Sequence, residues 1–302
     1  TSAVLQATGG DQVVWAGDAS QGVNGGGDFV RWVRTEEQAR EFAEFFAGEC
    51  SQVRVSGFLE GVPCSIHGLV LTDGVVVLRP MELASLRDPS TGRFLFAGIG
   101  TTWNPPEADT RQMRQLARRI GEHLRDRHGY RGAYGIDGVL TADGFRVTEL
   151  NTRMSGGLTR LGRAAPGAQL ELVQMNALLG RDIGMTADAY EELAMELVDE
   201  TRFIDVMGIS SQLVSQETFD VPITVGAQRL EIAGLDDDVV GTVSRGPSPM
   251  GTYIRMTTVP GVIGIGDRAA PLSVLLLAFA DREWGAGFGQ VLVAPEVRRA
   301  AE

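Results

Sequence analysis

The sequence contains no lysine, and all 27 basic residues of its 302 are arginines. Any cation that contacts a phosphate group in this protein must therefore be an arginine or a metal ion. Cysteine is nearly absent as well, since Cys50 and Cys64 are the only two. Two cysteines are too few for a disulfide framework and lack the spacing of a metal site, so we expect two reduced thiols.

Long apolar runs and excess positive charge are also missing. The most apolar segment, residues 271–280, is much shorter than the ~20 residues that span a bilayer, and no apolar leader opens the sequence. The net charge is −12, and residues 181–240 alone hold 14 acidic and 3 basic residues. These absences argue against a membrane or a nucleic acid as partner and predict a cytoplasmic protein that binds small molecules.

With 43% hydrophobic residues, the chain is long enough to bury a core and to form one large domain or two. Alternating apolar residues predict strands mainly before residue 80 and after residue 200. Helical periodicity predicts helices over residues 35–47, 105–128, 168–179, 188–198 and 271–283. A domain boundary is expected near residue 200, where acidic helical sequence gives way to short strands.

Residues 135–150 predict a β-hairpin, because two strand-like segments flank a Thr-Ala-Asp-Gly turn. Side chains alternate along a strand, so Glu149 and Asn151 point to one side and Asp137 can face them from the paired strand. Two carboxylates and an amide oxygen are ligands of the kind that Mg²⁺ takes when it also holds phosphate oxygens. Arg153 would extend positive charge beyond them. The alternative is an ordinary exposed hairpin.

The run Glu-Leu-Asn-Thr-Arg at residues 149–153, with Asp137 upstream and Ser-Gly-Gly at 155–157, resembles the metal-binding end of the ATP-grasp superfamily. The resemblance implies an α+β fold and a two-lobed clamp that holds ATP between two antiparallel sheets. It also implies that Asp137, Glu149 and Asn151 bind two Mg²⁺ ions. Arg153 and the N–H groups of Gly156 and Gly157 would then stabilise the oxyanions that form during catalysis.

A glycine-rich loop that includes Gly25, Gly26 and Gly27 lies about a hundred residues before the hairpin, where the family has its phosphate-covering loop. Such a loop can approach a polyphosphate closely, although a flexible linker would look the same.

A hinge that holds adenine through main-chain groups would comprise Phe58, Leu59 and Glu60. His67 would lie near the phosphates, with a hydrogen-bonded structural histidine as the alternative.

The sequence also departs from the family pattern. The acidic position before the hinge is Ser56, and the ribose-binding acidic position aligns with Pro63. The family's phosphate- and adenine-facing lysines have no counterpart, so arginines such as Arg31, Arg54 and Arg79 would have to replace them, although a solvated surface role is open for each.

The resemblance covers about residues 1–180. We expect an ATP-grasp domain over residues 1–200, with a lid lobe to about residue 80 and a metal-binding lobe over 81–200, followed by an accessory α/β domain, rich in strands, over 201–302. The family usually carries another α/β domain before the glycine-rich loop. Its apparent absence predicts that this domain is missing or supplied by another chain, and a homodimer is also open.

The activity that the resemblance implies is ATP-dependent ligation of a carboxylate to an amine, of the amino acid or peptide type, through an acyl phosphate. A non-catalytic ATP- or ADP-binding regulatory module and an ATP-dependent phosphotransferase on the same clamp are the alternatives. The partners would be a small carboxylate and an amine.

Overall fold

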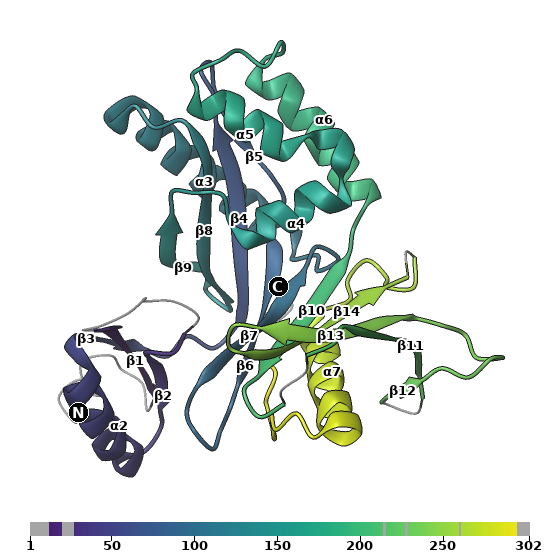
Figure 1. Cartoon of the computed structure of the whole chain (residues 1–302). Helices are drawn as coiled ribbons and strands as arrows, with labels where there is room; N and C mark the ends of the chain where they lie inside the picture. The colour runs from purple at the N-terminus through teal and green to yellow at the C-terminus, as the bar shows by residue number, and fades with distance from the viewer. Residues whose placement is uncertain (1–11, 20–26, 214–215, 227–228, 260, 295–302) are drawn as a thin grey trace.

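The computed structural model describes residues 12–19, 27–213, 216–226, 229–259 and 261–294. Within these residues the strands form two antiparallel sheets, one of three strands and one of eleven (Figure 1). No helix of this part of the chain is long and apolar enough to cross a membrane. The fold is α+β, as the sequence predicts.

A small N-terminal body contains the three-stranded sheet, in the order β2-β1-β3, and one helix. The helix, α2, begins after Thr35, whose hydroxyl caps it by accepting a hydrogen bond from the N–H of Gln38 at 3.2 Å. Phe42 and Phe46 of α2 pack into the core of this body. Its elements are β1 (Val13–Ala19), β2 (Val30–Val33), α2 (Glu36–Glu49) and β3 (Cys50–Gly57).

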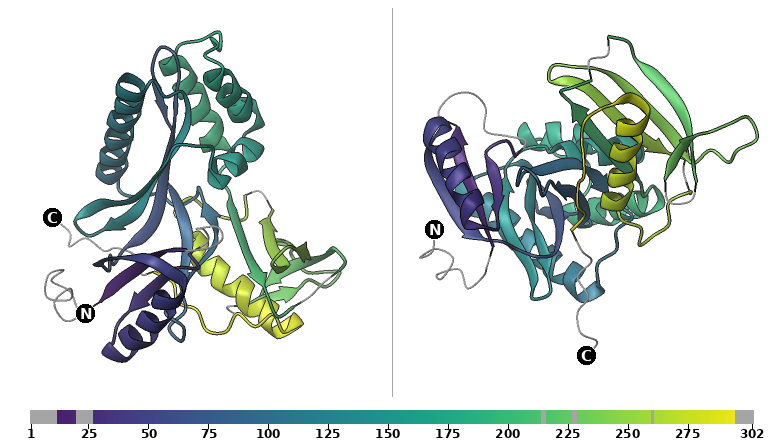
Figure 2. Two further views of the ribbon diagram at one scale, coloured as in Figure 1. Left: turned by 60° about the vertical axis from the view of Figure 1, so that its left-hand side comes forward. Right: turned by 90° about the horizontal axis from the view of Figure 1, so that it is seen from below.

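The large sheet begins directly after this body and runs to the C-terminal part of the chain. Its spatial order is β12-β11-β13-β14-β10-β7-β6-β4-β8-β9, with β5 paired to β4. Figures 1 and 2 show the purple N-terminal body standing beside one end of the long strand β4. The strands are β4 (Val62–Val70), β5 (Val75–Val77), β6 (Met81–Arg87), β7 (Phe94–Gly100), β8 (Gly132–Thr141), β9 (Gly144–Asn151), β10 (Ile204–Ser210), β11 (Phe219–Val225), β12 (Leu230–Ile232), β13 (Gly241–Ser248) and β14 (Gly251–Thr258).

Helices cover both faces of the β4–β8 region, and strand alternation decides which side chains meet which helices. Ile66 of β4 and Ile136 of β8 pack with helix α3 on one face. Leu69 and Ala133 lie on the other face and pack with α4, α5 and α6. These helices are α3 (Glu107–His128), α4 (Gly156–Ala164), α5 (Leu170–Leu178) and α6 (Ala187–Glu200), with a short 3-10 helix, η1 (Pro166–Ala168), before α5.

The strands after residue 200 continue the same sheet. Strand β10 pairs with β7 over Ile204 to Val206. Helix α7 (Ala269–Trp284) packs its apolar side against strands on both sides of this junction, β6 and β7 before residue 200 and β10 to β14 after it (Figure 1). The buried carboxylate of Glu82 accepts hydrogen bonds from Arg268 at 2.8 and 3.0 Å and from the N–H of Ala269 at 2.5 Å. Division of the chain at residue 200 stays a prediction. The small sheet ends at Gly57, and residues 62–77, expected in the lid lobe, lie in the large sheet.

Candidate active site

The candidate site lies on one face of strands β4, β8 and β9. The register pairs Asp137 of β8 with both Ser65 of β4 and Glu149 of β9. The neighbouring row contains His67, Gly135 and Asn151 in the same strand order. Residues two apart on a strand share a face, so these two rows lie side by side and present five polar side chains. The hairpin of the sequence prediction therefore forms, and it brings Asp137, Glu149 and Asn151 together.

The three candidate metal ligands differ in their environment. The amide Nδ2 of Asn151 donates to Asp137 Oδ2 at 3.1 Å, while Glu149 is exposed on the edge strand. Burial raises the pKa of the Asp137 carboxyl, and a hydrogen bond from Ser65 and the charge of Arg153 partly oppose this rise. A bound cation would favour the charged form of this carboxylate.

His67 lies on this face but does not line the cavity that adjoins it. Its side chain is buried, and its ring packs over Gly135, where a Cβ atom would approach His67 Cδ2 to 2.9 Å. Glycine at position 135 therefore makes room for the imidazole. His67 Nε2 lies 2.7 Å from Ser155 Oγ and 3.3 Å from Ser65 Oγ. Burial lowers the pKa of His67 to about 4, so the ring is neutral near pH 7.

These contacts connect Ser65, in the row of the candidate metal ligand Asp137, to the start of α4. Ser155 is the N-cap of that helix, and its Oγ accepts a hydrogen bond from the N–H of Leu158 at 3.0 Å. The histidine thus has the contacts of a structural residue, which was the alternative left open for it. Whether it also influences the nucleotide stays a prediction.

A cavity of about 640 Å³ separates the N-terminal body from the large sheet. The N-terminal body contributes Gly27 to its wall, the connecting segment contributes Phe58 and Leu59, and the hairpin contributes Asp137 and Glu149. Groups that are up to 135 positions apart in the sequence, from Val14 to Glu149, therefore meet around one space. Its volume is in the range of small-molecule and cofactor sites.

Two arginines supply the positive charges in this wall. Arg54 projects from β3, and Arg87 ends β6. Arg87 Nη2 donates to Glu60 Oε1 at 2.7 Å, and the guanidinium lies 4.8 Å from the centre of the Phe58 ring. Arg87 therefore holds the carboxylate of Glu60, one of the three predicted hinge residues, and stacks on another.

The other two arginines proposed for this role do not line the cavity. Arg31 donates to the carbonyl oxygen of Asp28 at 2.6 Å and stacks over Phe45, and Arg79 forms a bidentate ion pair with Asp199. Only Arg54 of the three adjoins the space. Ser56 and Pro63, which stand at the two acidic positions of the family pattern, also lie in its wall.

The remaining predicted residues have different settings. Gly25 and Gly26 lie outside the described residues, and Gly27 has a left-handed φ of 80° in the turn before β2. Arg153 is exposed, and its charge acts on Asp137. Gly156 and Gly157 open α4, where N–H groups have no partner within the helix.

Sequence reasoning missed Phe94, Phe96 and Arg87 in the cavity wall. The first two belong to β7, an unpredicted strand, and the third ends β6, which was also not predicted. An apolar run with phenylalanines at alternate positions 94 and 96 was the available signal.

The donor set limits which ions could bind. In the described part of the chain, no group of three or more His, Cys, Asp and Glu side chains could hold a metal ion. Two carboxylates and one amide remain at the hairpin, a set of hard oxygen donors that suits Mg²⁺ when a nucleotide supplies phosphate oxygens as further ligands. The residues present therefore fit Mg²⁺ together with a polyphosphate and do not fit a structural zinc site.

The small N-terminal body and the sheet edge that carries Asp137 and Glu149 line one cavity, the arrangement expected of a nucleotide clamp. Residues 21–157 match the sequence model of a family described as the ATP-grasp domain. This part of the chain is similar to the ATP-grasp domain, and the chain has the ATP-grasp fold. A comparison with curated proteins finds no match.

Two similar solved structures come from Aspergillus clavatus. The first is carboxyaminoimidazole ribonucleotide synthase complexed with ATP, with a TM-score of 0.55 and 14% sequence identity. The second is N5-carboxyaminoimidazole synthase in complex with ADP and 5-aminoimidazole ribonucleotide, with a TM-score of 0.52 and 13% identity. Each alignment covers 93% of this chain and 65% of the other. At these identities the likeness concerns the fold alone.

Proposed function

We propose that this protein is an ATP-dependent ligase that joins a carboxylate to an amine through an acyl phosphate. The observation that carries the proposal is the single cavity whose wall includes Gly27, Phe58, Asp137 and Glu149. ATP in this cavity would have its adenine near Phe58 and its phosphates near the hairpin. Solved structures of similar fold were obtained with ATP or with ADP, which supports a nucleotide as the ligand.

Asp137, Glu149 and Asn151 would hold Mg²⁺ beside the phosphates. Mg²⁺, when bound, would offset the negative charge on the β- and γ-phosphate oxygens. Asn151 keeps the Asp137 carboxylate oriented through its 3.1 Å hydrogen bond. Arg54, Arg87 and the N-terminal body would exclude water and position the polyphosphate, so most of the catalytic effect is positioning and electrostatics.

The reaction has two displacements. A carboxylate oxygen attacks the γ-phosphorus, the bond to the bridging oxygen of ADP breaks, and an acyl phosphate forms. The amine nitrogen then attacks the acyl carbon, inorganic phosphate leaves, and the nitrogen loses a proton. Arg153 and the N–H groups of Gly156 and Gly157 would stabilise the negative oxygens in both steps.

The first test is binding and turnover with matched variants of one hairpin. Mg²⁺-ATP should raise the melting temperature of the parent protein, because it binds only the folded state. Glu149→Gln and Asn151→Ala should abolish ADP release in the presence of carboxylate and amine mixtures. Asp143→Asn changes an exposed carboxylate in the turn of the same hairpin and should leave turnover unchanged.

Two results would contradict the proposal. One is a melting temperature that Mg²⁺-ATP leaves at its value in buffer. The other is a Glu149→Gln variant whose turnover stays within about threefold of the parent, a difference of about 0.7 kcal/mol in transition-state stabilisation.

Arg153→Ala separates a ligase from a regulatory module. A group that stabilises charge only during transfer should lower turnover roughly a hundredfold and leave the affinity for ATP nearly unchanged. Equal losses of affinity and turnover, or a parent that never releases ADP with any acceptor, would favour the regulatory module. Phosphorylated carboxylate or alcohol without amide product would identify a phosphotransferase.

A further inference from the structure

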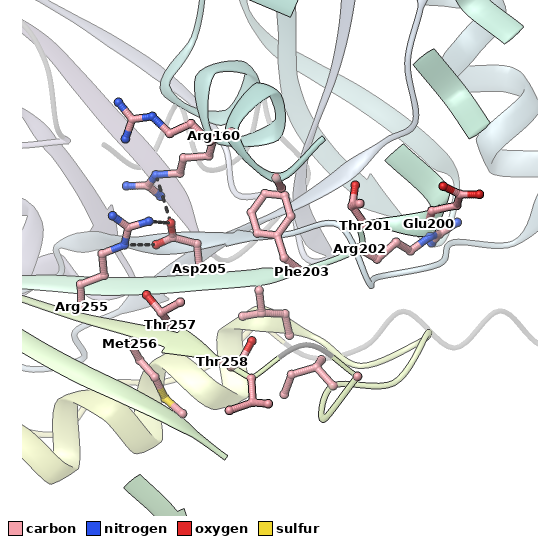
Figure 3. A pocket seen from close by; sticks show the side chains of 16 residues that line it. Arg160, Glu200, Thr201, Arg202, Phe203, Asp205, Arg255, Met256, Thr257 and Thr258 are labelled. Carbon is pink, nitrogen blue, oxygen red and sulfur yellow. Dashed lines mark hydrogen bonds and ion pairs between the residues drawn. The ribbon is translucent and has the colours of Figure 1, made fainter. Parts of the chain in front are cut away.

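A second cavity, of about 460 Å³, lies between helix α4 and strands β10 and β14. Four arginines line it, together with the carboxylates of Glu200 and Asp205. The four arginines are Arg160, Arg163, Arg202 and Arg255. Figure 3 shows that Arg160 and Arg255 converge on Asp205 from two sides. The cavity wall thus has more cationic than anionic groups, in a chain whose net charge is −12.

Asp205 orders two of the guanidinium groups but does not satisfy both. This buried carboxylate accepts hydrogen bonds from Arg255, one of them from Nε at 3.2 Å, and lies 3.6 Å from Arg160 Nε. Arg160 Nη2 contacts the sulfur of Met207 at 2.9 Å. Arg160 Nη1 is buried and has no hydrogen-bond partner among the described residues. A buried N–H donor of a cation that lacks an acceptor is costly, so this group is suited to receive an anion.

The other charged residues of the wall do not neutralise its excess of positive charge. Arg202 already has two acceptors, since it donates to Asp199 at 2.9 Å and to the carbonyl oxygen of Thr101 at 3.2 Å. Glu200 is exposed at the end of α6. Arg163 is exposed on α4, one turn beyond Arg160. Three cations therefore face the space with Asp205 as their only buried counter-charge in the wall.

The pKa of Arg160 is consistent with an excess of positive charge in the cavity wall. Burial lowers the pKa of its guanidinium, and the like charges of Arg255 and Arg163 lower it further, whereas Asp205 raises it. A site that concentrates like charges gains free energy when an anion enters. Thr257 carries a hydroxyl group beside Arg255, and hydroxyls donate readily to oxyanions (Figure 3).

Helix α4 connects this cavity to the candidate active site. Its N-cap, Ser155, hydrogen-bonds to His67, which lies in the row next to Asp137, and Arg160 lies one turn into the same helix. Figure 1 shows α4 crossing between the hairpin side of the sheet and the region of β10 and β14. A ligand held by Arg160 would therefore be positioned by the same rigid element that begins beside the reacting groups.

We propose that this second cavity binds the phosphate or carboxylate group of an acceptor substrate, held by Arg160 and Arg255. The identification of the ligand as an acceptor rests on the proposed ligase function, but binding of the anion itself does not require ATP. Phosphate and carboxylate share the chemistry that arginine forks recognise, namely two oxygens in one plane.

The test measures binding of inorganic phosphate and of acetate to the full chain by calorimetric titration at constant ionic strength. Because phosphate could also enter the nucleotide cavity, the variants decide which site is occupied. Arg160→Gln and Arg255→Gln should each weaken binding at least about tenfold, the effect of losing a charge-assisted hydrogen bond. Arg229→Gln removes an exposed arginine that is ion-paired with Glu231 at 2.6 Å and should leave binding unchanged.

Asp205→Asn provides a variant with the opposite expected sign. Removing the carboxylate that competes for Arg160 and Arg255 should strengthen phosphate binding severalfold, and phosphate should raise the melting temperature of this variant more than that of the parent. A purely structural ion cluster would be destabilised by the same change without any gain in affinity.

The outcomes separate this inference from the proposed function. Saturable binding of phosphate or acetate that Arg160→Gln weakens supports the second cavity as an anion site, and the stronger ligand identifies the group. Binding that is equal in the parent, Arg160→Gln and Arg255→Gln, or no saturable binding, overturns it. A protein that binds Mg²⁺-ATP but neither anion at this cavity retains the proposed ligase function and loses only this inference.

Discussion

Protonation of His67 should destabilise the folded protein as the pH falls below neutrality. The unperturbed pKa of histidine is 6.5, and burial lowers the pKa of His67 to about 4. Between these values the unfolded chain binds a proton that the folded chain does not bind. The free energy of unfolding therefore falls as the pH falls, and the contribution of the neutral ring is fully present only above pH 6.5.

The two pKa values set the size of the effect. Their difference corresponds to a loss of roughly 2 kcal/mol between pH 7 and pH 5 and of about 3 kcal/mol by pH 4. The buried setting supports an effect of this order, because the ring is 2% exposed and its Nδ1 has no hydrogen-bond partner among the described residues. A charged imidazolium would find no carboxylate in its direct hydrogen bonds, which are to Ser65 and Ser155.

The assay is chemical denaturation at pH 7 and pH 5 for the parent and two histidine variants. Carboxylates elsewhere also titrate in this range, so the comparison uses the change in unfolding free energy and not its absolute value. His67→Gln removes the titrating group and keeps hydrogen-bonding atoms, and its change should be smaller than that of the parent by about 2 kcal/mol. His123→Gln, at an exposed position of α3, should behave as the parent. Equal changes in the parent and His67→Gln would refute the reasoning.

Three further predictions concern the fold and the lid. Gly98→Ala should cost roughly 3 kcal/mol or more in unfolding free energy, because Gly98 has a φ of 130° and an added Cβ would lie 2.1 Å from a backbone oxygen of β10. Gly129→Ala, in open space at the end of α3, should cost about 1 kcal/mol, and equal costs would contradict the steric argument. Glu82→Ala leaves Arg268 unpaired in a buried site and should cost about 3–5 kcal/mol by denaturation, so a loss below about 1 kcal/mol would show that the pair is not needed. Amide hydrogen exchange at Gly27 should slow when Mg²⁺-ATP is added, and unchanged exchange would remove Gly27 from the nucleotide site.

The sequence by itself determined the local elements with clear periodicity. The hairpin β8–β9 follows from two alternating segments around an Asp-Gly turn, and this local register brings Asp137, Glu149 and Asn151 together. Helices α2 and α3 follow from a Thr35 cap and from apolar residues at helical spacing. The family resemblance carried by residues 149–153 also predicted the fold that the comparisons confirm.

Other elements escaped prediction because distant residues stabilise them. The segment of β6, Met-Glu-Leu-Ala-Ser-Leu-Arg, is rich in helix-forming residues, yet pairing with β4 and β7 and the contact of Glu82 with Arg268 keep it extended. Helix α4 begins with two glycines, which weaken a helical signal, and the Ser155 cap with its His67 contact stabilises its start.

Tertiary structure alone decided which arginines surround each cavity. No spacing in the sequence distinguishes Arg54 and Arg87, which adjoin the nucleotide cavity, from Arg31 and Arg79, which do not. Their roles depend on which strand faces the N-terminal body and on which acceptors already occupy each guanidinium. Side-chain alternation fixes the face of a residue within its own strand, but the partner strand across the sheet is selected by long-range packing, which a local pattern does not encode.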